Sequence, residues 1–163
     1  MTATSVEAGL AIRRASIRAQ STDVDPFRPI HLLLELDSPS APAAARLISA
    51  LDLRAPLERL AHAESLVVET AAIDSGGKVR LHPEIVSILA GSNQLAKRWA
   101  VPCVTTAHLL ASTVSFLLTH RHPSHTELSG LDAHVTQPPT SAGVRPATKL
   151  GDALLHLMRW REA

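Results

Sequence analysis

The side chains with the clearest potential for chemistry are three closely spaced histidines, His120, His122 and His125. Neutral imidazoles are good zinc ligands, so this trio could belong to a small metal-dependent hydrolase. A useful zinc site also needs further ligands and a rigid frame that fixes tetrahedral geometry. The sequence shows no such frame around residues 120–125, so we predict a solvated polar loop that holds no metal. The hydrolase is kept as the alternative function.

Cys103 and His108 form a second pair that could act together, as a thiolate nucleophile and its base. Such a pair needs an orienting acid and oxyanion donors, and the sequence identifies neither beside them. Cys103 is therefore predicted to be a buried structural residue. The tripeptide Gly76-Gly77-Lys78 lacks the spacing of a phosphate-binding loop. These observations predict no catalytic residue, no cofactor and no enzymatic activity.

Two histidines occupy matching places in the chain, in the tripeptides His31-Leu32-Leu33 and His108-Leu109-Leu110. Each tripeptide stands at the predicted start of a helix. The positive end of a helix dipole disfavours a charged imidazole, so both rings are predicted to be neutral. We expect each ring to form a hydrogen bond within the loop before its helix and to serve the structure rather than a ligand.

The stretch 83–118 contains the clearest helical period of the sequence. Its first half places apolar or small side chains at steps of three and four, which puts them on one face of a helix. The initial Pro-Glu pair suits the first helical turn, and Pro102 ends the helix. Thr105 or Thr106 can cap the helix that follows. The stripe of the first helix consists of Ile85, Ile88, Leu89, Ser92, Leu95, Ala96 and Trp99.

The same design occurs seventy-seven residues earlier in weaker form. Glu7 corresponds to Glu84 and His31 to His108, and the stripes of the two first helices have the same spacing. The chain is therefore predicted to contain an internal repeat. The predicted helices of the first copy span about 6–20, 30–37 and 43–51, and a fourth, after a turn at 52–55, carries a stripe from Leu57 to Ala71.

Residues 73–80 are predicted to join the two copies, because they contain the polar turn sequence Asp-Ser-Gly-Gly-Lys. Its flanks, VVETAAI and KVRL, could instead pair as a β-hairpin across the two glycines. Beyond residue 118 the match between the copies weakens. We predict a short helix within 126–131, a linker at 135–148 that is rich in Pro, Thr and Ser, and a terminal amphipathic helix at 150–158 that could stand in place of the repeat's last helix.

The overall composition restricts the class of protein. A hydrophobic fraction of 45% against 19% charged residues excludes a mainly disordered chain. Aromatic residues make up only 2%, so the core must consist of Leu, Ile, Val and Ala, as is typical of packed helices. The formal net charge of +1 gives no basis for binding nucleic acid or an acidic membrane. One cysteine, and no signal-like or membrane-spanning apolar run, predict a cytoplasmic protein.

An amphipathic helix, a short loop and the pattern Thr-x-His-Leu-Leu resemble the Clp repeat, which forms the duplicated N-terminal domain of ClpA- and ClpC-type unfoldase ATPases. The second copy carries the pattern as Thr106-Ala107-His108-Leu109-Leu110. The first copy has Pro29-Ile30-His31-Leu32-Leu33 and lacks the threonine. Its continuation, AAARLISALDLRAPLERL, is similar to the third and fourth helices of a repeat. The resemblance covers about residues 7–118.

The resemblance implies an all-α fold in which two four-helix repeats form one pseudo-twofold domain of about eight helices. The first repeat would span about 6–72 and the second about 81–161. It also implies a free-standing, non-enzymatic binding protein of the Clp proteolysis system. Such an adaptor or decoy would bind protein substrates, a Clp ATPase or peptide-like ligands, including antibiotics that target the parent domain.

In relatives such ligands use the start of each repeat's first helix, which corresponds here to Leu81, His82 and Glu84. ClpC-type relatives also bind phosphoarginine with the help of a glutamate before each motif histidine. Those positions are Ile30 and Ala107 in this chain. Because recognition of a guanidinium group needs a carboxylate, these residues argue against phosphoarginine binding.

Overall fold

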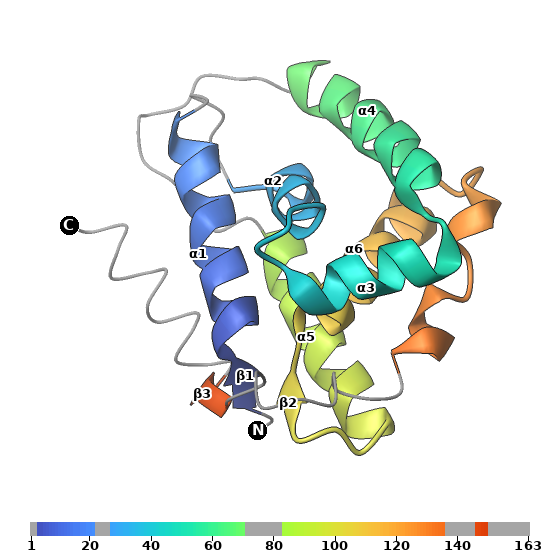
Figure 1. Cartoon of the computed structure of the whole chain (residues 1–163). Helices are drawn as coiled ribbons and strands as arrows, with labels where there is room; N and C mark the ends of the chain where they lie inside the picture. The colour runs from blue at the N-terminus through green and yellow to red at the C-terminus, as the bar shows by residue number, and fades with distance from the viewer. Residues whose placement is uncertain (1–2, 22–26, 71–82, 136–145, 150–163) are drawn as a thin grey trace.

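Helices dominate the computed structural model shown in Figure 1, which describes residues 3–21, 27–70, 83–135 and 146–149. The fold is all-α, as the sequence predicted. The described residues also contain a small sheet of three short strands. The helices are α1 (Val6–Ser21), α2 (Pro29–Leu36), α3 (Pro42–Leu51), α4 (Arg54–Thr70), α5 (Pro83–Arg98), α6 (Thr106–His120) and the 3-10 helices η1 (Thr126–Leu128) and η2 (Leu131–His134).

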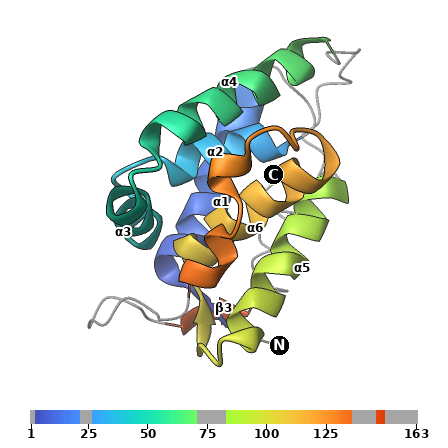
Figure 2. The same ribbon diagram turned by 90° about the vertical axis from the view of Figure 1, so that its right-hand side faces the viewer.

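The central element is α6, which contacts α1, α2, α3, α5 and η2. Figures 1 and 2 show the other helices arranged around it. Nine of its fifteen residues are buried, so more of its circumference is buried than the single apolar face of a surface helix. The core around it is aliphatic, and Phe27 is the one aromatic side chain among the described residues that is fully buried. None of the helices in the described ranges combines the length and hydrophobicity needed to cross a membrane.

The first two helices of each copy match closely. α1 and α5 each contain sixteen residues, and both of their ends lie seventy-seven positions apart. α2 and α6 begin at the same offset but differ in length, with eight and fifteen residues. The starts of the first two helices therefore follow the predicted offset of seventy-seven residues, and the longer α6 is the first large departure from it.

Beyond α6 the second copy differs from the first. The predicted short helix at 126–131 is present as η1, and η2 follows it. The joint at 73–80 and the predicted terminal helix lie outside the described residues. The alternative of a hairpin across Gly76-Gly77 needed residues 67–73 as its first strand. Most of these residues are instead helical, because α4 continues to Thr70.

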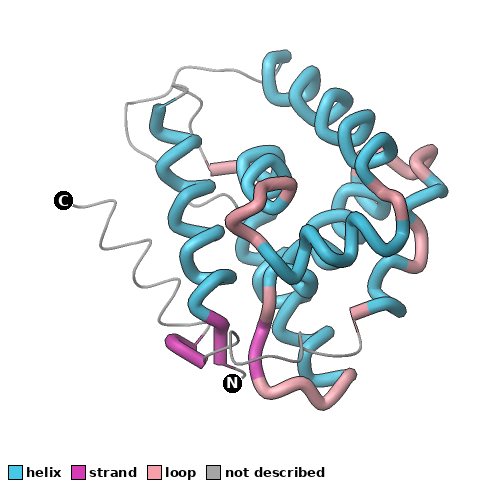
Figure 3. The backbone as a smooth tube through the Cα atoms, in the orientation of Figure 1, coloured by secondary structure: helices cyan, strands magenta, loops and turns pink. Residues whose placement is uncertain are grey.

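The sheet lies at the base of α1, where Figure 3 shows its strands in magenta. β1 (Ala3–Ser5) is the middle strand, with β2 (Cys103–Val104) parallel to it on one side and β3 (Pro146–Lys149) antiparallel on the other. Ala3 pairs with both Cys103 and Lys149. β3 corrects the end of the linker predicted at 135–148, because the backbone of this strand pairs with an edge of β1 that would otherwise lack hydrogen-bond partners. Residues 136–145 of that linker lie outside the described residues.

Candidate functional site

The predicted ligand surface lies at the start of α5. Leu81 and His82 fall outside the described residues. Glu84, in the first turn of α5, forms an ion pair with Arg121, which directly follows α6. The role of Glu84 as a ligand contact stays a prediction, and its carboxylate is already engaged in holding the start of α5 against the end of α6.

A buried charge cluster forms around Glu64 of α4, whose side chain is 1% exposed. The guanidinium of Arg121 donates to both of its carboxylate oxygens, with Nε 3.0 Å from Oε2, and thus binds it in a bidentate fork. His122 Nε2 lies 2.7 Å from the same Oε2. Burial works against the charge of Arg121, but the hydrogen bonds that it donates to Glu84 and Glu64 outweigh burial and raise the pKa of the guanidinium. The cluster ties α4, α5 and the end of α6 together.

This cluster corrects the prediction that residues 120–125 form a solvated loop. The side chain of His122 is only 11% exposed because it binds Glu64. His120 instead stacks on Phe116, with ring centroids 4.5 Å apart, and His125 Nδ1 lies 4.0 Å from a carboxylate oxygen of Glu127. The three imidazoles face different partners. In the part of the chain that the structure describes, no three His, Cys, Asp or Glu side chains are arranged to hold a metal ion.

The two motif histidines have the neutral, hydrogen-bonded state that the sequence predicted. Nδ1 of His31 accepts a hydrogen bond from the backbone N–H of Arg28 at 2.9 Å, and Nδ1 of His108 accepts one from Thr105 at 3.0 Å. Each donor is the residue that precedes the helix, so each ring closes the helix start. Burial lowers the pKa of both imidazoles to about 4. They are structural caps, repeated once in each copy.

The motif threonine has a role outside its own copy. Thr106 is fully buried, and its Oγ1 accepts a hydrogen bond from the backbone N–H of Ala44 at 2.9 Å. That N–H lies in the first turn of α3, whose N-cap residue Ala41 offers no side-chain acceptor. Thr106 therefore supplies the missing cap of α3 from the other copy. Pro29, at the equivalent position of the first copy, has no such group.

Cys103 is a buried free thiol in β2, in agreement with the structural role predicted for it. Burial raises the pKa of this thiol, with a smaller contribution from the charge of Glu7. A raised pKa keeps sulfur in its unreactive protonated form. The site therefore lacks the electropositive surroundings that a nucleophilic cysteine needs.

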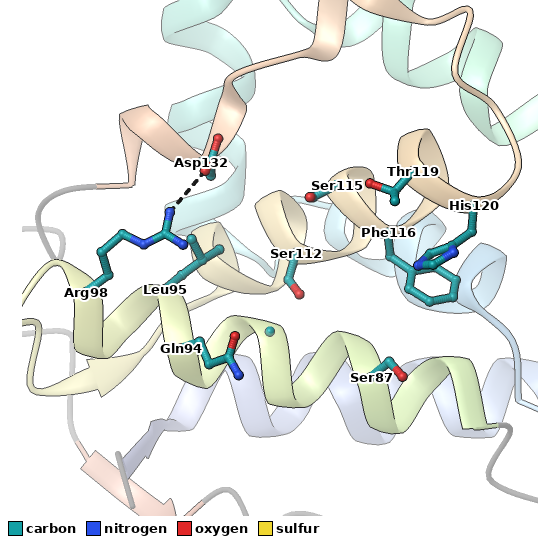
Figure 4. Close-up of a pocket in the computed structure, with 11 residues that line it drawn as sticks. Ser87, Gln94, Leu95, Arg98, Ser112, Ser115, Phe116, Thr119, His120 and Asp132 are labelled. Atoms are coloured by element: carbon teal, nitrogen blue, oxygen red, sulfur yellow. Dashed lines mark hydrogen bonds and ion pairs between the residues drawn. The ribbon is translucent and has the colours of Figure 1, made fainter.

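A polar groove of about 310 Å³ lies between α5, α6 and η2. Figure 4 shows Ser87 and Gln94 on the α5 side and Ser115, Thr119 and His120 on the α6 side. One end of the groove is closed by an ion pair between Arg98 and Asp132, with Nη1 and Oδ2 3.4 Å apart. The lining thus combines hydroxyl, carboxamide and imidazole groups with the apolar side chains of Leu95 and Phe116.

The floor of the groove depends on close packing between α5 and α6. Ser112 donates from Oγ to the backbone carbonyl of Ile88 at 2.6 Å, a bond that joins the two helices. A Cβ at Gly91 would lie 2.5 Å from this hydroxyl, so a glycine is needed for the helices to approach so closely. Sequence reasoning missed the groove, and the local signal that could have indicated it is the pair of small residues Gly91 and Ser112 between polar neighbours.

No family model, no curated protein and no solved structure matches this chain.

Proposed function

We propose that this protein is a non-enzymatic binding module that holds a short extended stretch of a protein or peptide in the groove between α5 and α6. The observation that carries the proposal is the chemistry of the lining. Hydroxyl and carboxamide groups, such as those of Ser87, Gln94 and Ser115, can each donate and accept hydrogen bonds. A peptide backbone presents one donor and one acceptor per residue, so such a lining can pair with either.

The size and exposure of the groove support the same class of ligand. Its volume of about 310 Å³ is at the lower end of the range for sites that enclose a small molecule. Ser87, Gln94, Ser115 and Thr119 all have exposed side chains, so the groove is open to solvent. An open polar groove suits a segment of a longer chain, which can enter along the side that faces solvent.

The resemblance to the Clp repeat supports a narrower form of the proposal. The partner would be a Clp-type unfoldase ATPase or one of its protein substrates, and the protein would act in the cytoplasm as an adaptor or decoy. The matched bounds of α1 and α5 and the two histidine caps fit this resemblance. Ser87 lies one turn after Glu84 on α5, so the groove begins near the one residue of the predicted ligand set that the structure describes.

The alternative of a metal-dependent hydrolase gains no support. His122 is engaged with Glu64, and His120 and His125 contact other partners, as described above. The described residues therefore offer no site at which three ligands meet.

The proposal is tested with two serine-to-arginine variants. Ser115→Arg places a long charged side chain in the groove, whereas Ser49→Arg makes the same change on the exposed side of α3. We expect the unaltered protein and Ser49→Arg to bind a purified ClpC-type unfoldase or its unfolded substrates with equal affinity, and Ser115→Arg to bind at least about tenfold more weakly, or about 1.4 kcal/mol.

Biolayer interferometry measures these affinities, and circular dichroism checks that both variants remain helical. Unchanged binding by Ser115→Arg would place the partner on another surface. If the unaltered protein binds neither the unfoldase nor its substrates, the Clp assignment is wrong.

A further inference from the structure

The closed end of the groove differs in chemistry from the rest of it. Among the described residues that line the groove, Arg98 at the end of α5 and Asp132 in η2 carry formal charges, and both lie at this end. Figure 4 shows Arg98 extending from α5 toward Asp132, whereas Ser87 and Ser115 lie farther along the groove. A segment that fills the groove therefore meets a charged pair where the groove stops.

The guanidinium of Arg98 has donors that the protein does not use. Its Nη1 lies 3.4 Å from Oδ2 of Asp132, and this is the one interaction that the guanidinium forms within the described ranges. A guanidinium has five N–H donors in a planar fork, so Nε and Nη2 remain for a ligand. The side chain is 60% exposed, so a ligand can reach them. Two parallel donors of this kind match the two oxygens of a carboxylate.

The charge at this end favours an anion over a cation. Lys97 is exposed beside Arg98 in the last turn of α5, so this end has two positive charges and the one negative charge of Asp132. A terminal amine would be repelled by both cations and would compete with Arg98 for Asp132. The end of the helix does not oppose an anion with free carbonyl groups, because those of Leu95, Ala96 and Lys97 already accept backbone hydrogen bonds.

The spacing of the polar groups along α5 fits an extended chain. Gln94 precedes Arg98 by four residues, or about 6 Å of helix, which is close to the length of two extended residues. Ser87 precedes Gln94 by seven residues, or about 10 Å, which is close to the length of three. All three line the groove. They present hydrogen-bonding groups over the length of roughly five extended residues, with the charged donor at the closed end.

We propose that the groove binds the C-terminal end of an extended polypeptide, with the terminal carboxylate on the guanidinium of Arg98. This assignment rests on the function proposed above, to which it adds an end and a direction. The bound chain runs in the same direction as α5. A chain that continues past the closed end must leave toward solvent, whereas a chain that stops there places its carboxylate against unused N–H donors.

Short random-sequence peptides, labelled with fluorescein in mid-chain, test the assignment on the full-length protein. One pool has both ends blocked, a second has a free C-terminal carboxylate, and a third has a free N-terminal amine. In fluorescence anisotropy the carboxylate pool should bind at least about fivefold more tightly than the blocked pool, as expected for one charge-assisted contact at a partly exposed site. The amine pool should bind no more tightly than the blocked pool.

Substitutions assign the preference to one side chain. Arg98→Gln should abolish the preference for the carboxylate pool. Arg59→Gln is the matched control, because Arg59 is 57% exposed and also binds an acidic residue of a 3-10 helix, Glu127 of η1. It should keep the preference. Asp132→Asn should keep it too, because this change removes the ion pair of Arg98 but leaves its donors.

The outcomes separate this assignment from the proposed function. Equal affinities for the blocked and carboxylate pools, tighter binding of the amine pool, or a preference that Arg98→Gln retains would each overturn the assignment. If the pools bind alike and Ser115→Arg weakens all of them, the groove holds a peptide but does not select its C-terminus. If none of the pools binds, the groove is not a peptide site and both proposals are wrong.

Discussion

α1 and α5 have the same length and share five equivalent buried positions, but their outward faces differ in chemistry. At equivalent positions α1 has Leu10 and Ile17 where α5 has Ser87 and Gln94. The buried faces agree because both helices pack on the second helix of their copy, which a histidine cap holds in place. The outward faces carry no such constraint. The comparison shows that the two helices share a buried face, while the exposed face of α5 lines a polar groove and that of α1 carries large apolar side chains.

The charges of the two copies differ in the same way. In the first copy Arg18 binds Glu35 with Nη2 3.2 Å from Oε2, and the arginine side chain is 44% exposed. In the second copy Arg121 binds both Glu64 and Glu84 and is only 18% exposed. The first pair lies within its own copy, whereas the second joins α5 and α6 to α4 of the other copy. The buried cluster therefore joins the two copies, and so does the exposed ion pair between Arg59 and Glu127.

The largest expected effect comes from breaking this buried cluster. Glu64→Ala should lower the free energy of unfolding by about 3–5 kcal/mol, because it leaves the Arg121 guanidinium buried without its bidentate partner. Glu35→Ala should cost only about 1 kcal/mol, since Arg18 stays in contact with water. Urea unfolding curves measure both. If the two variants lose the same free energy of unfolding, the buried position of the Arg121 cluster does not make it more important for stability than the Arg18–Glu35 pair.

The histidine caps should make stability depend on pH in both copies alike. The folded state keeps each ring neutral down to about pH 4, whereas the unfolded chain binds a proton near pH 6.5. The unfolded state therefore binds more protons in this range, and stability that is fully present above pH 6.5 is lost as the pH falls toward 4. Each histidine should contribute about 3 kcal/mol to this loss.

The pH effect is assigned with substitutions that keep a hydrogen-bond acceptor but cannot titrate. His31→Asn and His108→Asn should each remove about half of the difference between urea unfolding curves measured at pH 7.5 and pH 4.5, relative to the unaltered protein. His62→Asn is a control, because His62 is exposed on α4. A variant that retains the full pH dependence would mean that its histidine does not carry the effect.

The smallest effect concerns the cap that crosses between the copies. Thr106→Val keeps the shape of the side chain but removes the acceptor for the N–H of Ala44, so it should cost about 1 kcal/mol. Thr119→Val, at an exposed position of the same helix, should change stability by less than about 0.5 kcal/mol. Thermal unfolding distinguishes them. Equal stabilities for the two variants would mean that water replaces Thr106 as the cap of α3.

The sequence predicted the features that depend on local spacing. The stripe of α5, the proline at its start and each His-Leu-Leu tripeptide are short local patterns, so periodicity and capping rules identify them. The neutral state of His31 and His108 followed from their place at a helix start. The all-α class followed from the aliphatic composition.

The features that were missed depend on contacts between distant residues. Arg121 and Glu64 are separated by 57 positions, and nothing in the local sequence of either residue indicates the other. Glu64 therefore looked like one position in a helical stripe, and His122 looked like part of a solvated loop. The polar groove needs α5, α6 and η2 together. No single stretch of sequence contains its pattern.

The position of β1 has a consequence for the order in which the protein can fold. This strand is the first described segment of the chain, yet its two neighbours in the sheet are residues 103–104 and 146–149. Loops of this length close slowly, so contacts of high sequence separation form late. During synthesis one edge of the N-terminal strand can be paired only after residue 104 has been made, and the other edge only after residue 149. A purification tag joined before Ala3 would be held at this late-forming junction, whereas a tag inserted in an exposed turn such as Pro39-Ser40 would avoid it.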